Sequence, residues 1–414
     1  MAVPLATVGQ FLQRGGARRR VAGMILIVAT IGAALTAARD TVVMVHRVQE
    51  SETALRLRAW DPVALAVLTD SRAANGDISL PGNSALRRAL GADALNAPLL
   101  RLAGLAAEQK GDAASARHLI RLSDRLSRRD LGTEIWLVQD AVEHGDVPGA
   151  IAHYDALLAV HPFIRDQFFP VIAKALRYSE VQSALIPYIH RSVPWVISFL
   201  SNVAVHEPMP TARDIVPLLI NSDMLEEDEF RQIASRLLQR LVKEGEFPAA
   251  VTLADRMAAT DHSGLTNMAI SDQSTDRALR PLTWELARRN GAFASYDGNG
   301  QVRMRVSPDR QVVSLHRVMM LQPGHYSFGF KADFSQRKPI FAAGWDWYCL
   351  KSNDARSPIW HGDVEPSSAR RRYDFAIVVP GGCDAVEMQF VLTSTAYSMG
   401  EMSISDLTMT RPSA

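Results

Sequence analysis

The sequence is poor in the features that mark several common classes of protein. It has two cysteines in 414 residues, so it is not a disulfide-rich scaffold. Its formal net charge of +1 gives no general case for nucleic-acid binding. It contains no HExxH, P-loop, GxSxG or metal-spaced Cys/His motif. We therefore expect a non-enzymatic protein with no cofactor, no metal and no nucleic-acid partner.

Charge is also absent from one long run near the N-terminus. Residues 21–38 carry no charge and give roughly 27 Å of helix, close to the thickness of the hydrocarbon core of a bilayer. Four arginines crowd positions 14–20, so the positive-inside rule predicts a single-pass inner-membrane anchor with a cytoplasmic N-terminus and a periplasmic bulk. A signal peptide cleaved after the small residues 36–38, or a buried soluble helix, remain alternatives.

The two cysteines, Cys349 and Cys383, lie in the exported part of this scheme. Because that compartment is oxidising, we expect them to form a disulfide. The alternative is that they are two unpaired, small apolar residues.

A glycine followed by an acidic residue recurs with a period near 34. An alanine follows five residues later in most copies, and in a degenerate copy that lacks the glycine. The residues of this pattern are Gly76, Gly111, Gly145 and Gly245, with Ala116, Ala150, Ala184 and Ala250. Such a period is typical of a helix-turn-helix solenoid. The glycine would end the first helix, the acidic residue would cap the second, and the alanine would allow two helices to cross closely.

Two segments, "APLLRLAGLAAEQKGDAASARHLIRLSDRLSRRD" and "TEIWLVQDAVEHGDVPGAIAHYDALLAVHP", resemble tetratricopeptide repeats. The resemblance covers about residues 60–257, and a generic helical bundle is the alternative. It implies a concave surface for a protein partner, and we assign Trp136, Gln139 and Asp140 to that groove.

After residue 284 the hydrophobic period changes to two, as in "QVRMRV", "HYSFGF" and "VEMQFVL", with turns between the runs. This pattern predicts a β-sandwich or jelly roll. The segments "LQPGHYSF" and "ISDLTMT" resemble jelly-roll carbohydrate-binding modules and galactose-binding-like domains. These segments report a turn and strands, and they identify no ligand and no sugar contacts. The turn "DGNG" is similar to the start of a calcium loop, but it lacks the later ligands and is interpreted as a hairpin turn.

These patterns predict a multidomain chain with a transmembrane helix, an all-α solenoid and an all-β sandwich. The predicted boundaries are a cytoplasmic basic tail at 1–20, the membrane span at 21–38, a connecting helix at 39–59, the solenoid at 60–260, a linker at 261–281 and the sandwich at 282–412.

Candidate ligand-binding residues gather in the sandwich. In the strand "GWDWYCL", alternation places Trp345 and Trp347 on the core side with Cys349, and Asp346 and Tyr348 on the other side. The remaining candidates lie in or beside the loop that follows, and Arg370 to Arg372 fit an acidic polysaccharide or a phosphate-bearing partner. A solvated charge run is the alternative for the arginines. The full candidate set is Asp346, Tyr348, Trp360, His361, Asp363, Arg370, Arg371 and Arg372.

The leading hypothesis is a periplasmic scaffold that assists cell-surface polysaccharide synthesis or export, with repeats that bind an envelope protein and a sandwich that binds glycan. One alternative is a carbohydrate-active enzyme with its site on the sandwich. Another is an assembly factor that binds no glycan. The reactive types at 206–207 and 261–263 are adjacent in sequence, and adjacent residues rarely form a working triad, so we assign no catalytic residues.

Overall fold

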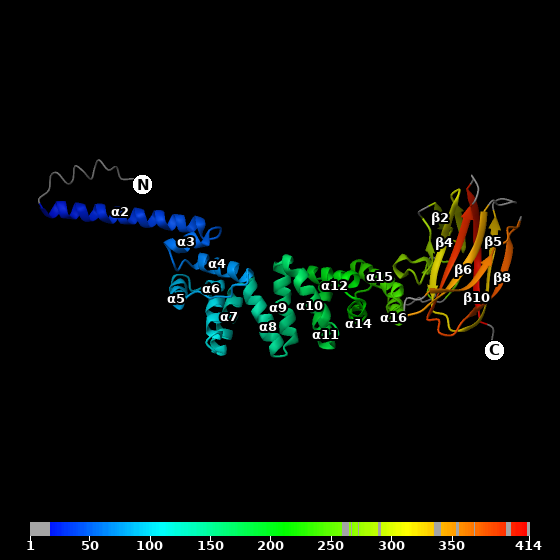
Figure 1. The fold of residues 1–414 in the computed structure, drawn as a ribbon, viewed down its shortest axis with the longest axis horizontal. Coiled ribbons are helices and arrows are strands. Elements are labelled where there is room, and N and C mark those ends of the chain that lie inside the picture. Colours follow the sequence, from blue (N-terminus) through cyan, green and yellow to red (C-terminus); the bar gives the residue numbers. More distant parts are fainter. Residues whose placement is uncertain are drawn as a thin grey trace. The chain divides into compact units, whose positions relative to one another are not determined.

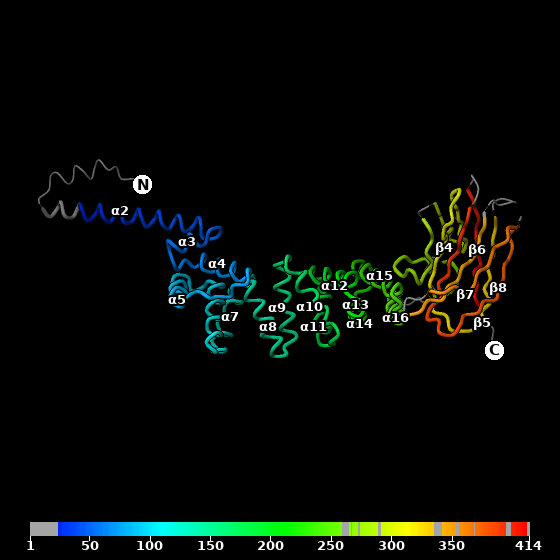
Figure 2. The backbone as a smooth tube through the Cα atoms, in the orientation of Figure 1, coloured from blue at the N-terminus to red at the C-terminus, as the bar shows by residue number. Residues whose placement is uncertain are grey.

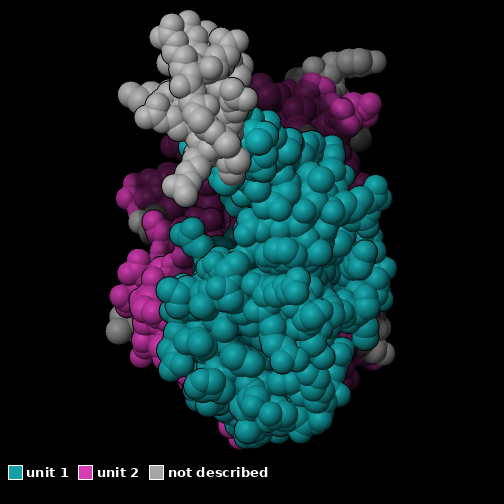
Figure 3. All heavy atoms as spheres, turned by 90° about the vertical axis from the view of Figure 1, so that its left-hand side faces the viewer, with its two compact units in different colours: residues 1–161 teal, residues 162–414 magenta. Residues whose placement is uncertain are grey.

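The computed structural model describes residues 17–258, 265, 267–271, 273–288, 291–334, 341–352, 356–367, 369–394 and 399–411. It divides into two compact units, Met1–His161 and Pro162–Ala414, which Figure 3 shows in different colours. The predicted fold class is confirmed, because the chain combines an apolar N-terminal helix, a helical region and a C-terminal two-sheet β-sandwich (Figure 1). The residues at 261–263 that the sequence analysis considered for catalysis lie outside the described residues.

The first long helix, α2 (Ala17–His46), contains a segment, Met24–His46, that is long and apolar enough to cross a membrane. None of that segment is buried within the protein. The helix runs past the predicted end of the span at residue 38, and a turn at residues 47–50 separates it from α3 (Ser51–Leu57). The segment predicted as one connecting helix is therefore the end of α2, a turn and α3.

Helices then follow in consecutive pairs, most of them joined by short turns, as the tube in Figure 2 traces. The pairs of the first unit are α4 (Pro62–Ala74) with α5 (Asn83–Ala92), α6 (Ala97–Glu108) with α7 (Ala113–Leu126), and α8 (Leu131–Glu143) with α9 (Val147–Val160). The second unit begins with α10 (Arg165–Ala175), α11 (Ser179–His190), α12 (Pro194–His206), α13 (Met209–Arg213), α14 (Ile215–Asn221), α15 (Asp228–Lys243) and α16 (Phe247–Met257).

Glycine closes the first helix of several pairs because the turn requires a left-handed backbone. Gly111 and Gly145 have φ angles of 80° and 70°, which glycine adopts without steric cost. The aspartate after each one then caps the next helix, since Asp112 accepts a hydrogen bond from the Ser115 amide and Asp146 from the Gly149 amide.

The other repeat positions follow the same geometry with one variation. Gly76 and Gly245 also have positive φ angles. Ala116, Ala150 and Ala250 are buried where helices pack, whereas Ala184 is half-buried and the neighbouring Leu185 fills the core. The degenerate copy of the repeat thus places a larger side chain at the helix contact.

A buried arginine joins three helices of the first unit. Arg101 of α6 lies 2.7 Å from Asp70 of α4 and 2.6 Å from Asp130, which caps α8. The guanidinium also lies against Gly132, where any larger residue would collide with it. Successive pairs are therefore linked by charge-assisted hydrogen bonds as well as by apolar packing.

The sandwich consists of two five-stranded antiparallel sheets, with strand orders β1-β4-β9-β6-β7 and β2-β3-β10-β5-β8. The first sheet contains β1 (Glu285–Leu286), β4 (Arg310–Met319), β9 (Ala385–Ser394), β6 (Phe341–Leu350) and β7 (Arg356–Asp363). The second contains β2 (Ala292–Tyr296), β3 (Gln301–Val306), β10 (Gly400–Thr410), β5 (Gly324–Phe334) and β8 (Arg371–Val379). The inward side chains of both sheets form one aromatic-rich core that includes Trp284, Trp345, Trp347, Phe328, Phe330 and Phe390.

A fully buried arginine attaches the linker to this core. Arg317 of β4 donates to the carbonyl oxygens of Leu282, Asn267 and Leu265. Its guanidinium also lies 5.4 Å from the ring centroid of Trp284. Burial lowers the pKa of Arg317 to about 10, so it still carries its charge at neutral pH.

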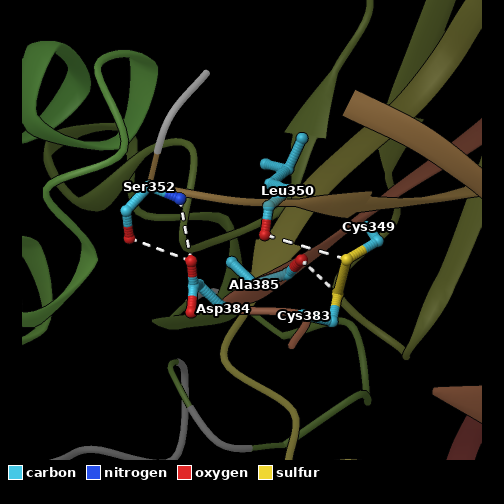
Figure 4. The surroundings of a disulfide bond; sticks show 6 residues. All are labelled: Cys349, Leu350, Ser352, Cys383, Asp384 and Ala385. Carbon is cyan, nitrogen blue, oxygen red and sulfur yellow. Dashed lines mark hydrogen bonds between the residues drawn. A yellow bond between two sulfur atoms is a disulfide. The ribbon is translucent and has the colours of Figure 1, made fainter. Parts of the chain in front are cut away.

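The disulfide forms between Cys349 at the end of β6 and Cys383 just before β9, with Cα atoms 5.4 Å apart (Figure 4). Beside it, Asp384 accepts hydrogen bonds from the backbone amide and the hydroxyl of Ser352. The backbone of Ser352 in turn packs against Gly245 in the α15–α16 turn. The disulfide region is thus also where the last helix pair contacts the sandwich.

Candidate functional site

A row of charged side chains crosses the solvent-facing side of the first sheet. Glu285 of β1 lies 3.3 Å from His316 of β4, whose other ring nitrogen lies 3.0 Å from Glu387 of β9. Arg356 of β7 continues the row at 2.6 Å from Glu387. Because strand residues alternate between faces, these side chains lie opposite the aromatic core.

Two carboxylates control the charge of His316. Its burial opposes protonation, but hydrogen bonds and charge from Glu285 and Glu387 outweigh burial and raise its pKa to about 9. The same pairing lowers the pKa of Glu285. Burial acts to raise the pKa of Glu387, but His316 outweighs it and the pKa is lowered. At neutral pH negative and positive side chains therefore alternate along the row.

The predicted ligand residues Asp346, His361 and Asp363 meet at the β6–β7 edge of the same sheet. His361 Nδ1 lies 2.7 Å from Asp346 Oδ1, and its Nε2 lies 3.1 Å from Asp363 Oδ1. The hydrogen bond with Asp346 raises the pKa of His361, and Asp363 adds to the effect. With a carboxylate at both ring nitrogens, the imidazole has no free nitrogen with which to activate a nucleophile.

The predicted aromatic contacts, Tyr348 and Trp360, are half-buried by packing against other side chains. The Arg356 guanidinium carbon lies 3.5 Å from the centroid of the Tyr348 ring. The Trp360 ring packs edge-on against Trp347 and Phe375, and it folds over Gly362. Trp345 and Trp347 are both fully buried, so they fill the core of the sandwich.

The predicted arginine cluster lies on the second sheet, at and just before β8. Arg370 lies 3.8 Å from Asp406, Arg371 lies 3.9 Å from Glu365, and Arg372 lies 3.0 Å from Asp374. These partners neutralise most of the positive charge that the sequence places there. Among the described residues, the ion pairs of the three arginines do not include His361, whose own partners are Asp346 and Asp363 on the β6–β7 side of the other sheet.

A second group of arginines converges at a place that no sequence motif marks. A cavity of about 940 Å³ opens beside β1 and the start of β4, at the sheet edge opposite to His361. Its described lining holds four arginines and no carboxylate. The lining residues are Arg277, Arg280, Arg288, Arg310, Leu286, Ala287, Ala292, Gln311, Val312 and Val313.

Arg280 is the most enclosed of these four arginines. Its Nε is buried and has no hydrogen-bond partner among the described residues. Burial lowers the pKa of Arg280, and the charges of Arg277 and Arg288 lower it further, against the opposing effect of Glu285. Like charges around one cavity repel each other, and a bound anion would relieve that repulsion.

Sequence reasoning missed this cavity because its arginines come from the linker, the segment after β1 and the start of β4, and no motif contains them. The only available signal was that the linker carries Arg277 and Arg280 among small polar residues. Their convergence depends on the packing of the linker against the sheet, which Arg317 establishes.

The partner groove of the repeats stays a prediction, and the structure shows only where its three predicted residues lie. Asp140 lines a cavity of about 610 Å³ between α7, α8 and α9, where Arg117 lies 2.8 Å from it. Trp136 donates to Glu108, and Gln139 donates to Glu143. Asp140 is thus the one predicted groove residue placed in that cavity.

No known protein-family model matches the sequence, and no curated protein matches it. The tetratricopeptide resemblance therefore stays a prediction. The sandwich is similar to carbohydrate-binding modules of known structure. One, titled "CBM4 structure and function", is 15% identical over 37% of this chain and 100% of its own, with a TM-score of 0.27.

Two further modules have comparable values. TmCBM61 in complex with beta-1,4-galactotriose is 11% identical over 31% of this chain and 88% of its own, with a TM-score of 0.23. The structure titled "Family 16 Carbohydrate Binding Module-2" is 15% identical over 29% of this chain and 86% of its own, with a TM-score of 0.22. Similarity at this level does not establish a function.

Proposed function

We propose that this chain is a non-enzymatic, membrane-tethered adaptor whose sandwich binds an acidic polysaccharide. The observation that carries the proposal is the arginine cavity, which presents several guanidinium groups and, among its described lining residues, no neutralising carboxylate. Guanidinium groups bind carboxylate, phosphate and sulfate through paired hydrogen bonds. The cavity volume of about 940 Å³ suits an oligosaccharide segment.

The remaining lining of the cavity fits a sugar as well as an anion. Leu286, Val312 and Val313 supply apolar surface against which the C–H faces of a pyranose ring can pack. Gln311 adds a neutral donor and acceptor for hydroxyl groups. A simple inorganic anion needs neither feature, so the combination favours an acidic sugar over a bare phosphate.

Two features support an envelope location for this adaptor. The apolar segment Met24–His46 is long enough for a membrane anchor. The disulfide between Cys349 and Cys383 is the kind of bond that persists in an oxidising compartment outside the cytoplasm. We assign the helical pairs to a protein partner in the envelope, in support of polysaccharide synthesis or export.

The proposal is tested by measuring binding of the detergent-solubilised full-length protein to a panel of acidic and neutral polysaccharides. We expect binding to acidic members only, with affinity reduced at least tenfold in the double variant Arg280→Gln/Arg310→Gln. The matched control is Arg372→Gln, which removes an arginine already paired with Asp374 on the other sheet.

The same samples are assayed for release of reducing sugar. Turnover of any bound polysaccharide would contradict the adaptor and favour a carbohydrate-active enzyme. Equal binding of neutral and acidic polysaccharides would contradict the role of the arginines. Failure to bind any glycan, together with capture of envelope proteins, would favour a pure assembly factor.

A further inference from the structure

Three successive helices of the first unit direct metal-ligating side chains to one point. Asp124 of α7, Glu134 of α8 and His153 of α9 place their carboxylate oxygens and imidazole nitrogen within 4.8 Å of one another. His153 Nδ1 lies 2.8 Å from Glu134 Oε2. These residues are separate in sequence, and no metal-binding motif contains them.

The two carboxylates of this cluster are incompletely paired. The Glu134 side chain is fully buried, yet its Oε1 has no hydrogen-bond partner among the described residues, and neither has Asp124 Oδ1. Arg128 lies 3.7 Å from that Asp124 oxygen, beyond hydrogen-bonding distance. Burial raises the pKa of Glu134 against the opposing hydrogen bond with His153, and the adjacent Asp124 carboxyl also raises it. The fully buried Glu134 carboxylate and the half-buried Asp124 carboxylate beside it thus leave unsatisfied acceptors that a cation can satisfy.

An ion has access to the cluster from the cavity of about 610 Å³, because Asp124 and His153 are among its lining residues. Three arginines of α7 also line this cavity. They face four carboxylates when Glu134 is included with Asp124, Asp140 and Asp146. Arg117 and Arg121 lie 2.8 Å and 3.8 Å from Asp140, so these two arginines pair with a carboxylate outside the cluster.

We propose that Asp124, Glu134 and His153 bind a divalent transition-metal ion of the zinc type. An imidazole nitrogen with two carboxylate oxygens is a donor set that suits Zn²⁺, whereas Mg²⁺ and Ca²⁺ prefer oxygen ligands alone. Around tetrahedral zinc, ligand atoms lie about 3.4 Å apart, so His153 and Glu134 need to separate by roughly half an ångström. Water from the cavity completes the coordination.

The site would act as a cross-link between repeats. Asp124 belongs to the α6–α7 pair, whereas Glu134 and His153 belong to the α8–α9 pair. A metal ion held by all three ligands stabilises the stacking of these two pairs, because it binds the folded arrangement and has no preformed site in the unfolded chain.

The test uses the full-length protein in detergent, stripped with EDTA and titrated with ZnCl₂ by calorimetry. We expect one zinc ion per chain and a rise in the melting temperature of the helical region. Glu134→Gln and His153→Gln should each weaken zinc binding by about 100-fold or more. The matched control is His144→Gln, which removes another histidine that lines the same cavity and should bind zinc as the wild type does.

Far-UV circular dichroism in metal-free buffer shows whether each variant is folded. If either variant is unfolded, Asp124→Asn is tested in its place. X-ray absorption of the zinc complex should show nitrogen and oxygen ligands including one imidazole. Zinc binding that survives the Glu134 and His153 substitutions would overturn the proposal. Absence of stoichiometric uptake by the wild type, or a preference for Ca²⁺ over Zn²⁺, would overturn it as well.

Discussion

At the scale of single residues, His316 gives the sandwich a stability that depends on pH. Its pKa is about 9 in the folded protein, above its unfolded value near 6.5. The stabilisation is complete below about pH 6.5 and is lost as the pH rises through 9, on the order of 3 kcal/mol in all. Glu285 and Glu387 have lowered pKa values, so their contribution is lost in acid, below about pH 4.5.

We predict that His316→Gln reduces the decrease in the free energy of unfolding between pH 6.5 and 9. Urea unfolding monitored by tryptophan fluorescence at several pH values measures the free energy of unfolding. The free energy of unfolding of the variant should be lower than that of the wild type at pH 6 and close to it at pH 9.5. An equal difference at both pH values would contradict the linkage.

Two turn glycines differ in what surrounds them, and this gives a matched pair of substitutions. Gly111 and Gly245 have φ angles of 80° and 79°. An added Cβ meets open space at Gly111, but at Gly245 it meets the backbone of Ser352 at 2.9 Å. Gly111→Ala should cost about 1 kcal/mol, the cost of a left-handed alanine, and Gly245→Ala should cost more. Thermal unfolding measures both, and equal losses would show that the Ser352 contact is unimportant.

Residue-level prediction from the sequence succeeded where the reason was local. The backbone requirement of a helix-ending turn is visible in the Gly-Asp pairs, and strand alternation places Trp345 and Trp347 in the core. It failed for the arginine cavity, because Arg277 and Arg310 come together only through the packing of the linker on the sheet. The sequence analysis also proposed Arg370 to Arg372 as ligand residues. Arg370 pairs with Asp406 of β10 and Arg371 with Glu365 of the β7–β8 loop, and no local pattern reveals these two partners.

At the scale of elements, the helix pairs depend on polar links as well as apolar packing. Arg101 is buried between Asp70 and Asp130, and it connects α4, α6 and the cap of α8. We predict that Arg101→Met destabilises the first unit by about 3–5 kcal/mol, because the buried carboxylate of Asp130 loses its charged partner, whereas Asp70 is exposed to water. Circular dichroism during thermal unfolding measures the change.

A smaller effect in Arg101→Met/Asp130→Asn than in Arg101→Met alone would confirm that the unpaired carboxylate causes the loss. Additive effects would indicate that Arg101 contributes through packing only. The arrangement of elements itself could be predicted from period and turn signals, as the sandwich and the helical pairs show. The break after His46 could not, because the apolar pattern continues across it.

At the scale of the whole molecule, the account requires that α2 tethers the chain to a membrane. We predict that the full-length protein stays in the membrane fraction after alkaline carbonate extraction, whereas a chain lacking residues 1–46 is soluble. N-terminal sequencing of the mature protein provides the check on cleavage. A mature N-terminus near residue 39 would show that the segment is a signal peptide, and recovery of the intact chain in the cytosolic fraction would contradict the anchor.

The most direct test of the central claim compares one acidic polysaccharide with its carboxyl-reduced form, so that the ligand differs only in charge. The account predicts that the full-length protein binds the native polymer, with an affinity that falls as salt rises, and that it binds the reduced polymer at least tenfold more weakly. It also predicts that Arg280→Gln/Arg310→Gln removes this difference. Equal affinity for the two polymers, or a difference that persists in the double variant, would contradict the assignment of the arginine cavity as the glycan site.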